Sequence, residues 1–380
     1  MSYLFETEEH TELRRTARRF AETHIAPYSR AWEEACEFPR ELYGLAAQAG
    51  MLGVSYPEHL GGHAGDLSHA LVASEELVLA GHSVGTCTGL HSHGIALPPI
   101  VAHGTPAQQE RFVTPVLRGE KIAALGITEP SGGSDVASLR TRAVRDGDHY
   151  LVNGSKTFIT SGCRADFVTC AVRTGGPGHG GISMLVIERG TPGFTVSKKL
   201  EKTGWWASDT AELSFADCRV PVSNLIGEED MGFYAIMTNF ATERIYIAGQ
   251  CIAIAELAYR ESVKYARERE AFGKTLMAFQ VTRHKLADMK SRIAAARALT
   301  SEATTRHLRG EQNPSLYAMT KNVATDMCSF VVDHAVQIHG GNGYMREYLV
   351  ERLYRDARIY PIGGGTREIM NEIIAKAEGY

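Results

Sequence analysis

The sequence lacks the features that mark a membrane or a secreted protein. Its 380 residues contain no apolar run of the ~18 residues that a membrane-spanning helix requires. The first stretch, MSYLFETEEHTELRRTARRF, mixes acids with bases and has neither the apolar core nor the small-residue cleavage site of a secretion signal. We therefore expect a soluble protein of the cytoplasm.

Disulfide, metal and nucleic-acid signatures are missing as well. The seven cysteines never form a CxxC pair and are odd in number, so we expect reduced thiols that pack in the interior. Histidines gather at His91 and His93, but no CxxC or HExxH accompanies them, and no metal site is predicted. The formal charge is −4 and no block of Lys or Arg occurs, which argues against a nucleic-acid partner.

What remains is the composition of an ordinary globular chain, 44% hydrophobic and 22% charged, with no repeat or low-complexity tract. Apolar residues recur at three and four from Glu6 to Leu117, which predicts helices, with Asp66 as an N-cap and Gly50 as a C-cap. The interval becomes two between Ala123 and Val220, as expected for strands.

Helical spacing returns after residue 228. Helices are predicted over 231–268, 275–309, 314–338, 347–357 and 366–378. Asp146-Gly147 and Asn153-Gly154 predict turns between strands. We therefore expect three domains: helical over 1–122, antiparallel β over 123–228, and an antiparallel helical bundle over 229–380.

Two motifs of the middle segment could carry chemistry. In GITEPSGGSDVAS, residues 126–138, glycines let backbone N–H groups turn toward a ligand, and hydroxyls can bind a polar ring edge or a phosphate. In NGSKTFITSG, a turn is expected to precede Phe158 and Thr160 on one face of a strand. Each alone is weak evidence, because ordinary loops and strands look the same.

Two further motifs lie in the C-terminal segment. REREAFGK predicts a long charged helix that ends at Gly273 and leaves Arg269 available to an anion. In QIHGGNGYMREYLVERLYRD, residues 337–356, three glycines break a helix and permit close backbone approach.

Together the four motifs resemble the acyl-CoA dehydrogenase family, and the similarity runs essentially end to end. GITEPSGGSDVAS fits the first family signature; the second is fitted by Gln337, Gly340, Gly341, Gly343, Tyr344, Glu347, Arg352 and Asp356. The resemblance implies an α+β multidomain fold with a helical N-terminal domain, a middle antiparallel β-barrel domain and a C-terminal four-helix bundle. It also implies one FAD per subunit and assembly as a dimer or, more often, a homotetramer.

The resemblance implies the cofactor contacts too. Thr128 and Ser134 would contact the flavin and its phosphate side, and Phe158, in place of the common Trp, would lie by the isoalloxazine with Thr160 near its reactive nitrogen. Further contacts, in part across a subunit interface, would come from Ile127, Ile159, Arg269, Phe272, Gln280, Gln337, Gly340, Gly341, Thr366 and Glu368. A basic residue at the pyrophosphate explains how an acidic protein could bind this anion.

The family reaction oxidises an acyl thioester to its trans-2-enoyl form and needs a carboxylate to take the α proton, while flavin N5 takes the β hydride. In many relatives that carboxylate precedes the Gly-Thr of the last motif, where this chain has Gly364. The long-chain and isovaleryl-CoA branches carry Glu-Arg on a C-terminal helix instead. Glu243-Arg244 matches that pattern, so the resemblance implies Glu243 as the base.

Helical spacing supports Glu243 independently. The carboxylate falls in an apolar stripe made by Ile236, Phe240, Ile247, Cys251 and Ile254. Its helix neighbours at three and four include no Lys or Arg, so burial should raise its pKa toward working pH, which suits a general base. Two alternatives stay open: pairing with an arginine of another helix, and loss of catalysis in an FAD-stabilised assembly protein.

Substrate contacts are expected from Ser134, Arg244, Gly364 and Gly365. The N–H of Gly364 could donate to the thioester carbonyl, and the missing side chain is expected to leave room for a branched or bulky acyl group. We expect a medium to long acyl-CoA and electron-transfer flavoprotein as the electron acceptor. An acyl group on a carrier protein, or oxygen as the acceptor, remains open.

Overall fold

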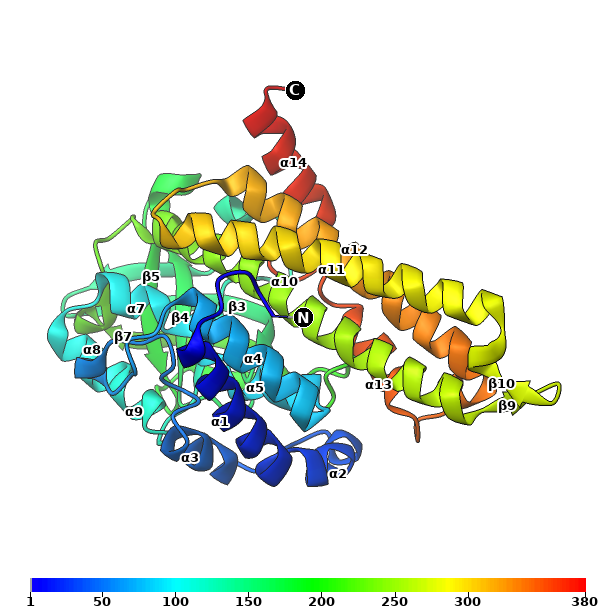
Figure 1. Ribbon diagram of the computed structural model, residues 1–380. Helices are drawn as coiled ribbons and strands as arrows, with labels where there is room; N and C mark the ends of the chain where they lie inside the picture. Colours follow the sequence, from blue (N-terminus) through cyan, green and yellow to red (C-terminus); the bar gives the residue numbers. More distant parts are fainter. Residues whose placement is uncertain (1) are drawn as a thin grey trace.

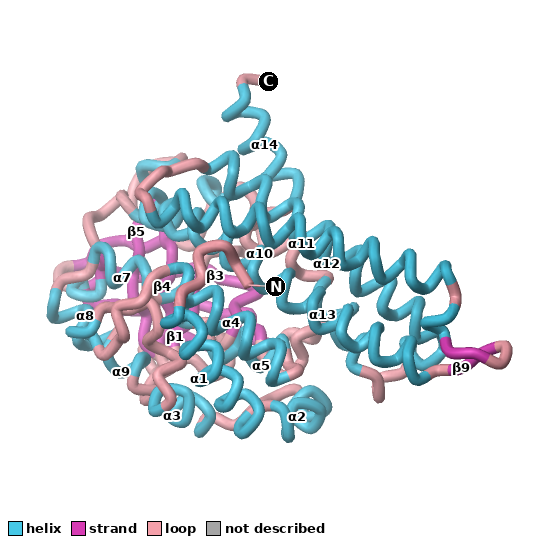
Figure 2. Tube along the Cα trace, in the orientation of Figure 1, coloured by secondary structure: helices cyan, strands magenta, loops and turns pink. Residues whose placement is uncertain are grey.

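The computed structural model describes residues 2–380, in which helices, a sheet and a second set of helices follow one another (Figures 1 and 2). The N-terminal helices are α1 (Glu8–His24), α2 (Ser29–Ala35), α3 (Glu41–Gln48), α4 (Leu67–Gly81), α5 (Val84–Leu90), α6 (His93–Ala96), α7 (Pro98–His103), α8 (Pro106–Phe112) and α9 (Thr114–Leu117). This order confirms the predicted fold class.

The predicted caps of the first segment are confirmed. The Asp66 carboxylate accepts hydrogen bonds from the backbone N–H groups of Ser68 and His69 at the start of α4. Gly50 follows α3 in the left-handed region, with a φ of +76°. The side chains of α4 are buried almost all round, because this helix lies between α1 and α10.

The middle segment forms one sheet of eight strands: β1 (Ala123–Gly126), β2 (Arg142–Asp146), β3 (His149–Thr160), β4 (Phe167–Arg173), β5 (Ile182–Glu188), β6 (Phe194–Lys199), β7 (Thr210–Pro221) and β8 (Leu225–Ile226). The order is β6-β7-β3-β2-β4-β5-β8, with β1 beside β4. Most pairs are antiparallel as predicted, but β4 runs parallel to both β1 and β2. The sheet is therefore mixed.

One of the two predicted turns is wrong. Asp146-Gly147 does connect β2 to β3, but Asn153-Gly154 lies inside β3, at a register shift opposite β7. Gly154 has a φ of +146°, and a Cβ added there would lie 2.6 Å from the Thr141 hydroxyl oxygen. Gly154 therefore lies in a β-bulge, where the absence of a side chain lets Thr141 approach its backbone closely, and not in a hairpin turn.

The C-terminal segment contains α10 (Gly232–Glu268), α11 (Gln280–Leu308), α12 (Pro314–His339), α13 (Leu349–Ala357) and α14 (Arg367–Glu378). The three long helices α10, α11 and α12 pack side by side, and α14 extends from them to the C-terminus (Figure 1). Gly249 lets α10 approach α4 closely, since a Cβ added there would lie only 2.5 Å from Cδ2 of Leu71 in α4.

The first long helix ends at residue 268, as the apolar spacing predicted, and not at Gly273, where the REREAFGK motif was expected to end it. Glu268 is its last residue, and β9 (Glu270–Ala271) and β10 (Lys274–Thr275) then form a hairpin with Phe272 and Gly273 at its turn. Both turn residues have positive φ, the conformation of a tight hairpin turn, so Gly273 belongs to a turn between two strands and does not cap a helix. The next helix begins at Gln280 rather than 275 for the same reason. The hairpin lies at the far end of the bundle (Figures 1 and 2).

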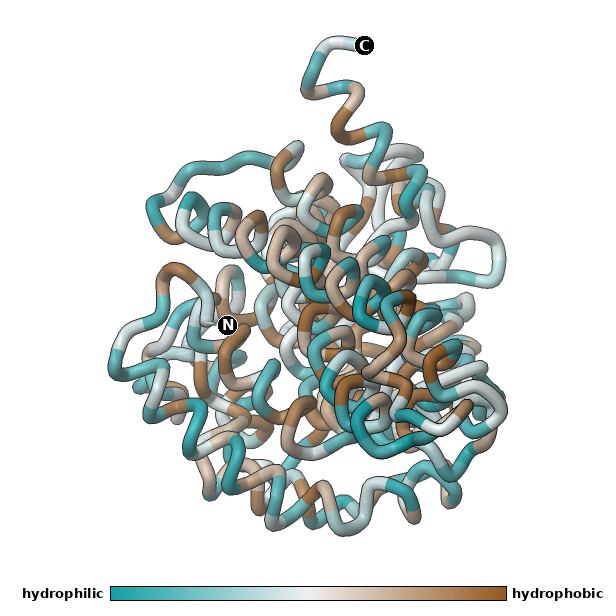
Figure 3. The backbone as a smooth tube through the Cα atoms, turned by 45° about the vertical axis from the view of Figure 1, so that its right-hand side comes forward, coloured by the Kyte–Doolittle hydropathy of each residue, from teal (hydrophilic) through white to brown (hydrophobic). Residues whose placement is uncertain are grey.

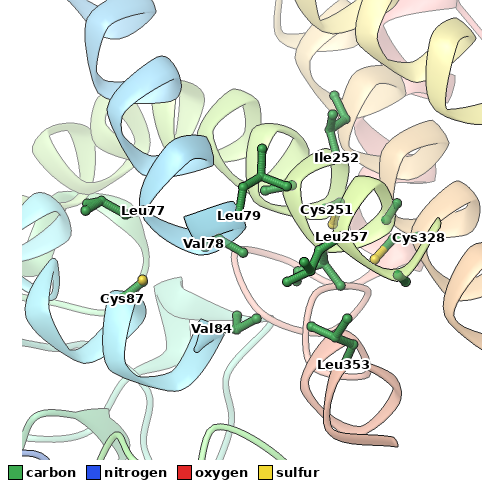
Figure 4. Close-up of a cluster of buried hydrophobic side chains, with 14 of the residues drawn as sticks. Leu77, Val78, Leu79, Val84, Cys87, Cys251, Ile252, Leu257, Cys328 and Leu353 are labelled. Carbon is green, nitrogen blue, oxygen red and sulfur yellow. The ribbon is translucent and has the colours of Figure 1, made fainter. Parts of the chain in front are cut away.

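A single hydrophobic core joins the N-terminal helices to the bundle. Leu77 of α4, Ile252 of α10, Cys328 of α12 and Leu353 of α13 belong to it (Figure 4). Each large apolar side chain buried in this way contributes ~1.5–3 kcal/mol relative to an exposed one. Hydrophobic segments accordingly gather where the helices meet (Figure 3).

The cysteines agree with the predicted packing of reduced thiols in the interior. All seven thiols are free, and five of them are buried. Over residues 2–380, no helix has the length and apolar character to cross a membrane.

Candidate active site

Glu243 faces the loop between α13 and α14. A Cβ added at Gly364 of that loop would lie 3.5 Å from Oε1 of Glu243, so the carboxylate and the glycine are direct neighbours. The other oxygen, Oε2, is buried and has no hydrogen-bond partner. Burial raises the pKa of Glu243 to about 7, against the nearby charges of Arg244 and Lys321, which lower it. The predicted rise in pKa is therefore confirmed.

The carboxylate of Glu243 has no ion-pair partner within residues 2–380. The alternative in which an arginine of another helix neutralises it is thus not found. Its chain neighbour Arg244 is also buried, with Nε unpartnered, and burial lowers the pKa of this guanidinium. Both side chains of the Glu-Arg pair therefore keep polar atoms free for a ligand.

The expected open space beside Gly364 is a wrong prediction. A Cβ at Gly364 would lie 2.5 Å from Cδ1 of Ile247, and Cε of Lys321 would lie 3.7 Å away. Gly364 and Gly365 have φ values of +65° and +98°, a region that side chains disfavour. The glycines therefore serve a tight loop packed against α10 and α12, and they do not create a cavity for a branched acyl group.

Lys321 was missed by the sequence analysis. It is 1% exposed, and its Nζ donates a hydrogen bond to the Gly365 carbonyl at 2.6 Å. Burial lowers its pKa to about 8. A signal was present, because Lys321 lies three residues after Ala318 and three before Ala324 in an apolar helix, and such a lysine is anomalous.

A second buried lysine organises the loop that begins at Ile127. Lys156 of β3 is 0% exposed, and its Nζ lies 3.0 Å from the Ile127 carbonyl oxygen and 2.8 Å from Oε1 of Glu129. The same carboxylate accepts hydrogen bonds from the backbone N–H groups of Arg140 and Thr141, at 2.6 and 2.8 Å. Both ends of the glycine-rich loop are therefore fixed to one buried ion pair.

This arrangement determines where the loop can bind a ligand. The Thr128 carbonyl accepts the N–H of Thr157 at 2.9 Å, so two successive carbonyls of the loop point to β3. In a trans peptide the C=O and N–H groups point in opposite directions, so the N–H of Thr128 points away from Lys156. It has no protein acceptor within residues 2–380 and is free to donate to a ligand.

The aromatic plane beside this loop is exposed. Phe158 is 69% exposed, while Ile159 is buried and Thr160 is half-buried; the shared face of Phe158 and Thr160 stays a prediction. Phe158 has a φ of +60°, within a register shift of β3 against β7. A free N–H donor beside an exposed aromatic face and a hydroxyl fits a planar polar ring such as the flavin of FAD.

The remaining predicted cofactor residues fall into two other places. Arg269, Phe272, Gln280, Gln337, Gly340 and Gly341 are all exposed at the hairpin end of the bundle. Figure 1 shows this end lying away from the sheet, so one chain does not bring these residues to Phe158. Thr366 and Glu368 lie at the start of α14, where Thr366 caps the helix through Ile369 N–H. Ser134 is exposed in the glycine-rich loop.

Comparisons with known proteins agree with this geometry. The chain matches the acyl-CoA dehydrogenase N-terminal domain over residues 7–120, the middle domain over 124–218 and the C-terminal domain over 230–379. It is 41% identical to the long-chain specific acyl-CoA dehydrogenase, mitochondrial, of Rattus norvegicus, over 97% of this chain and 86% of the relative.

Solved structures give the same picture. A probable acyl CoA dehydrogenase from Mycobacterium abscessus superposes with a TM-score of 0.97 and 53% identity, over 98% of this chain and 99% of that one. A chain described under "Electron transferring flavoprotein of Acidaminococcus fermentans" superposes with a TM-score of 0.95 and 37% identity, over 100% and 99%.

Proposed function

The chain belongs to the acyl-CoA dehydrogenase family of FAD flavoprotein oxidoreductases, and we propose that it desaturates an acyl-CoA thioester with Glu243 as the base. The observation that carries this proposal is the buried, unpartnered Oε2 of Glu243 beside Gly364. A carboxylate with a pKa of about 7 is half deprotonated at neutral pH and can accept a proton from carbon.

The glycine loop opposite Glu243 supplies the other polar group. The backbone N–H of Gly364 has no acceptor within residues 2–380 and can donate to the thioester carbonyl. Such a donor stabilises the negative charge that develops on that oxygen as the α proton leaves. Arg244 and Gly365 would contact the same part of the substrate.

Thr128, Phe158 and Thr160 would hold the flavin end of FAD, with Ile127 and Ile159 contributing through their backbone. Bound FAD supplies the acceptor for the β hydride. The exposed residues of the hairpin end, from Arg269 to Gly341, would complete the FAD site of a second subunit, which supports an assembly of at least two copies, the minimum for the predicted homotetramer. That assembly, like the cytoplasmic location, stays a prediction.

The substrate proposed for this chain is a medium to long acyl-CoA, and the name of the rat relative, long-chain specific acyl-CoA dehydrogenase, supports the long end of that range. The description of the Acidaminococcus structure names an electron transferring flavoprotein, which supports an electron-transfer flavoprotein as the electron acceptor. Both assignments are proposals for this chain.

Anaerobic titration of the purified holoenzyme with straight and branched acyl-CoAs tests the function. We expect loss of flavin absorbance in the wild type and in Glu261→Gln, a matched change on the same helix α10, but not in Glu243→Gln with FAD retained. Undiminished bleaching in Glu243→Gln would contradict the assignment of the base. If no CoA ester bleaches the wild type despite bound FAD, the result would favour an acyl group on a carrier protein as the substrate, or a non-catalytic FAD-stabilised assembly protein.

A further inference from the structure

Lys321 holds the glycine loop that faces Glu243. Its hydrogen bond to the Gly365 carbonyl, at 2.6 Å, is the only one that Gly364 or Gly365 forms within residues 2–380. Two successive glycines with positive φ have wide conformational freedom, so a loop of this kind needs a fixed contact to keep one shape. The buried ammonium of Lys321 provides that contact from α12.

Lys321 and Glu243 also lie against the same glycine. A Cβ added at Gly364 would lie 3.7 Å from Cε of Lys321 and 3.5 Å from Oε1 of Glu243. The titratable groups that face Lys321 are Glu243, Arg244 and Cys251, all on α10, and those that face Glu243 are Arg244 and Lys321. Lys321 is thus the one positive charge that reaches Glu243 from another helix within residues 2–380.

We propose that Lys321 is a positioning residue for the reaction proposed above: its ammonium tethers the Gly364-Gly365 loop and its charge favours the carboxylate form of Glu243. The inference rests on the proposed function, because it assigns Lys321 a role only through Glu243 and the Gly364 N–H. A lysine that merely satisfied a buried carbonyl would fix the loop without changing how Glu243 titrates. The pH dependence of proton removal therefore distinguishes the two roles.

Proton removal can be followed without hydride transfer. The probe is 3-thiadodecanoyl-CoA, an unbranched thioester that has α hydrogens and a sulfur atom in place of the β carbon, incubated with the holoenzyme in heavy water. Glu243 removes an α proton and the enolate takes up a deuteron, while no bond to a β hydrogen exists to break. Mass spectrometry measures deuterium uptake as a function of pH.

Two variants separate the tether from the charge. Lys321→Gln removes the charge and keeps an N–H donor, and Lys321→Met removes both. Lys290→Met is the matched control, because Lys290 of α11 also pairs with a carboxylate of α10, Glu256, outside the site. Thermal unfolding verifies that each variant is folded.

In the wild type and Lys290→Met, we expect uptake to rise with pH through about 7. In Lys321→Gln the midpoint should move up by roughly half a unit to one unit, because a facing positive charge is lost. Lys321→Met should show the same shift and a plateau lower by ~10–100-fold, because the Gly364 donor is displaced.

An unshifted midpoint in both Lys321 variants would overturn the proposal, even if the plateau fell. If Lys321→Met does not fold, Lys321→Gln alone decides the question. Absence of uptake in the wild type would instead contradict the function proposed for Glu243, so the two failures are distinct.

Discussion

At the scale of single residues, Gly364 has a backbone conformation that a substitution would strain. Its φ of +65° costs an L-residue ~1–2 kcal/mol. The nearest atom to an added Cβ is Cδ1 of Ile247, at 2.5 Å, so the two side chains would also have to separate. The position that bears the base in many relatives therefore cannot readily accept a side chain here.

We predict that Gly364→Ala lowers the melting temperature and slows flavin reduction by substrate ~10–100-fold, because the thioester donor moves. Gly363→Ala is the matched control, since its φ is not in the left-handed region and an added Cβ would meet nothing closer than 3.7 Å. Differential scanning fluorimetry and stopped-flow absorbance measure the two effects. Equal effects of the two variants would contradict the packing described for Gly364.

Sequence patterns identified some site residues and missed others for a physical reason. Glu243 was identified because its anomaly is local: a carboxylate in an apolar helical stripe. Lys321 shows a similar local anomaly, a lysine in an apolar helix, but spacing within one element does not show that its partner is Gly365. The contact of Lys156 with Ile127 is hidden from strand spacing for the same reason. Asn153-Gly154 was misassigned because tertiary pairing with β7 overrides the local turn preference.

At the scale of elements, the glycine-rich loop and β3 behave as one unit. Lys156 and Thr157 bind two successive carbonyls of the loop, directly before the exposed Phe158. The two motifs that the sequence presents separately are thus joined through the buried pair of Lys156 and Glu129. Removal of one partner would leave a buried charge without compensation, which typically costs ~3–5 kcal/mol.

Lys156→Met should therefore lower the melting temperature strongly and weaken FAD binding. Adding Glu129→Gln should recover part of the stability, because no buried charge then remains unpaired. Arg30→Met breaks an exposed ion pair with Glu34 and should leave both properties nearly unchanged. Calorimetry of the apoprotein measures the melting temperature, and FAD titration by fluorescence measures the affinity. An FAD affinity unaltered in Lys156→Met would count against the role of the pair in shaping the loop.

At the scale of the whole molecule, the cofactor site predicted from the sequence is spread over separate regions of one chain. Phe158 and Thr160 lie at the C-terminal end of β3, Thr366 and Glu368 lie at the start of α14, and six residues lie exposed at the hairpin end of the bundle (Figure 1). Phe272, at the hairpin turn, is 95% exposed. An apolar side chain so exposed in one chain is readily explained by contact with a second copy.

We predict that Phe272→Ser weakens FAD binding and shifts the assembly toward smaller species, measured by fluorescence titration and analytical ultracentrifugation. The matched control is Leu4→Ser, since Leu4 is 85% exposed but lies outside the predicted site. A wild-type monomer that retains tight FAD binding would contradict this part of the account.

The order of helices and strands could be predicted from apolar spacing alone, but the relation between the domains could not. One hydrophobic core spans α4, α10, α12 and α13, and this packing brings Glu243, Gly364 and Lys321 together. Spacing within α10 shows that Glu243 faces the interior, yet it does not show which glycine or lysine it meets there.

The measurement that tests the central claim most directly is single-turnover reduction of bound FAD by ordinary and 2,2-dideuterated acyl-CoA over a range of pH. We predict a wild-type rate that rises with pH through about 7, as Glu243 deprotonates, and that falls with the deuterated substrate. In Glu243→Gln the rate should drop by at least ~10²–10⁴-fold. A Glu243→Gln enzyme that reduces FAD at near wild-type rate, and still discriminates against deuterium, would show that another group removes the α proton.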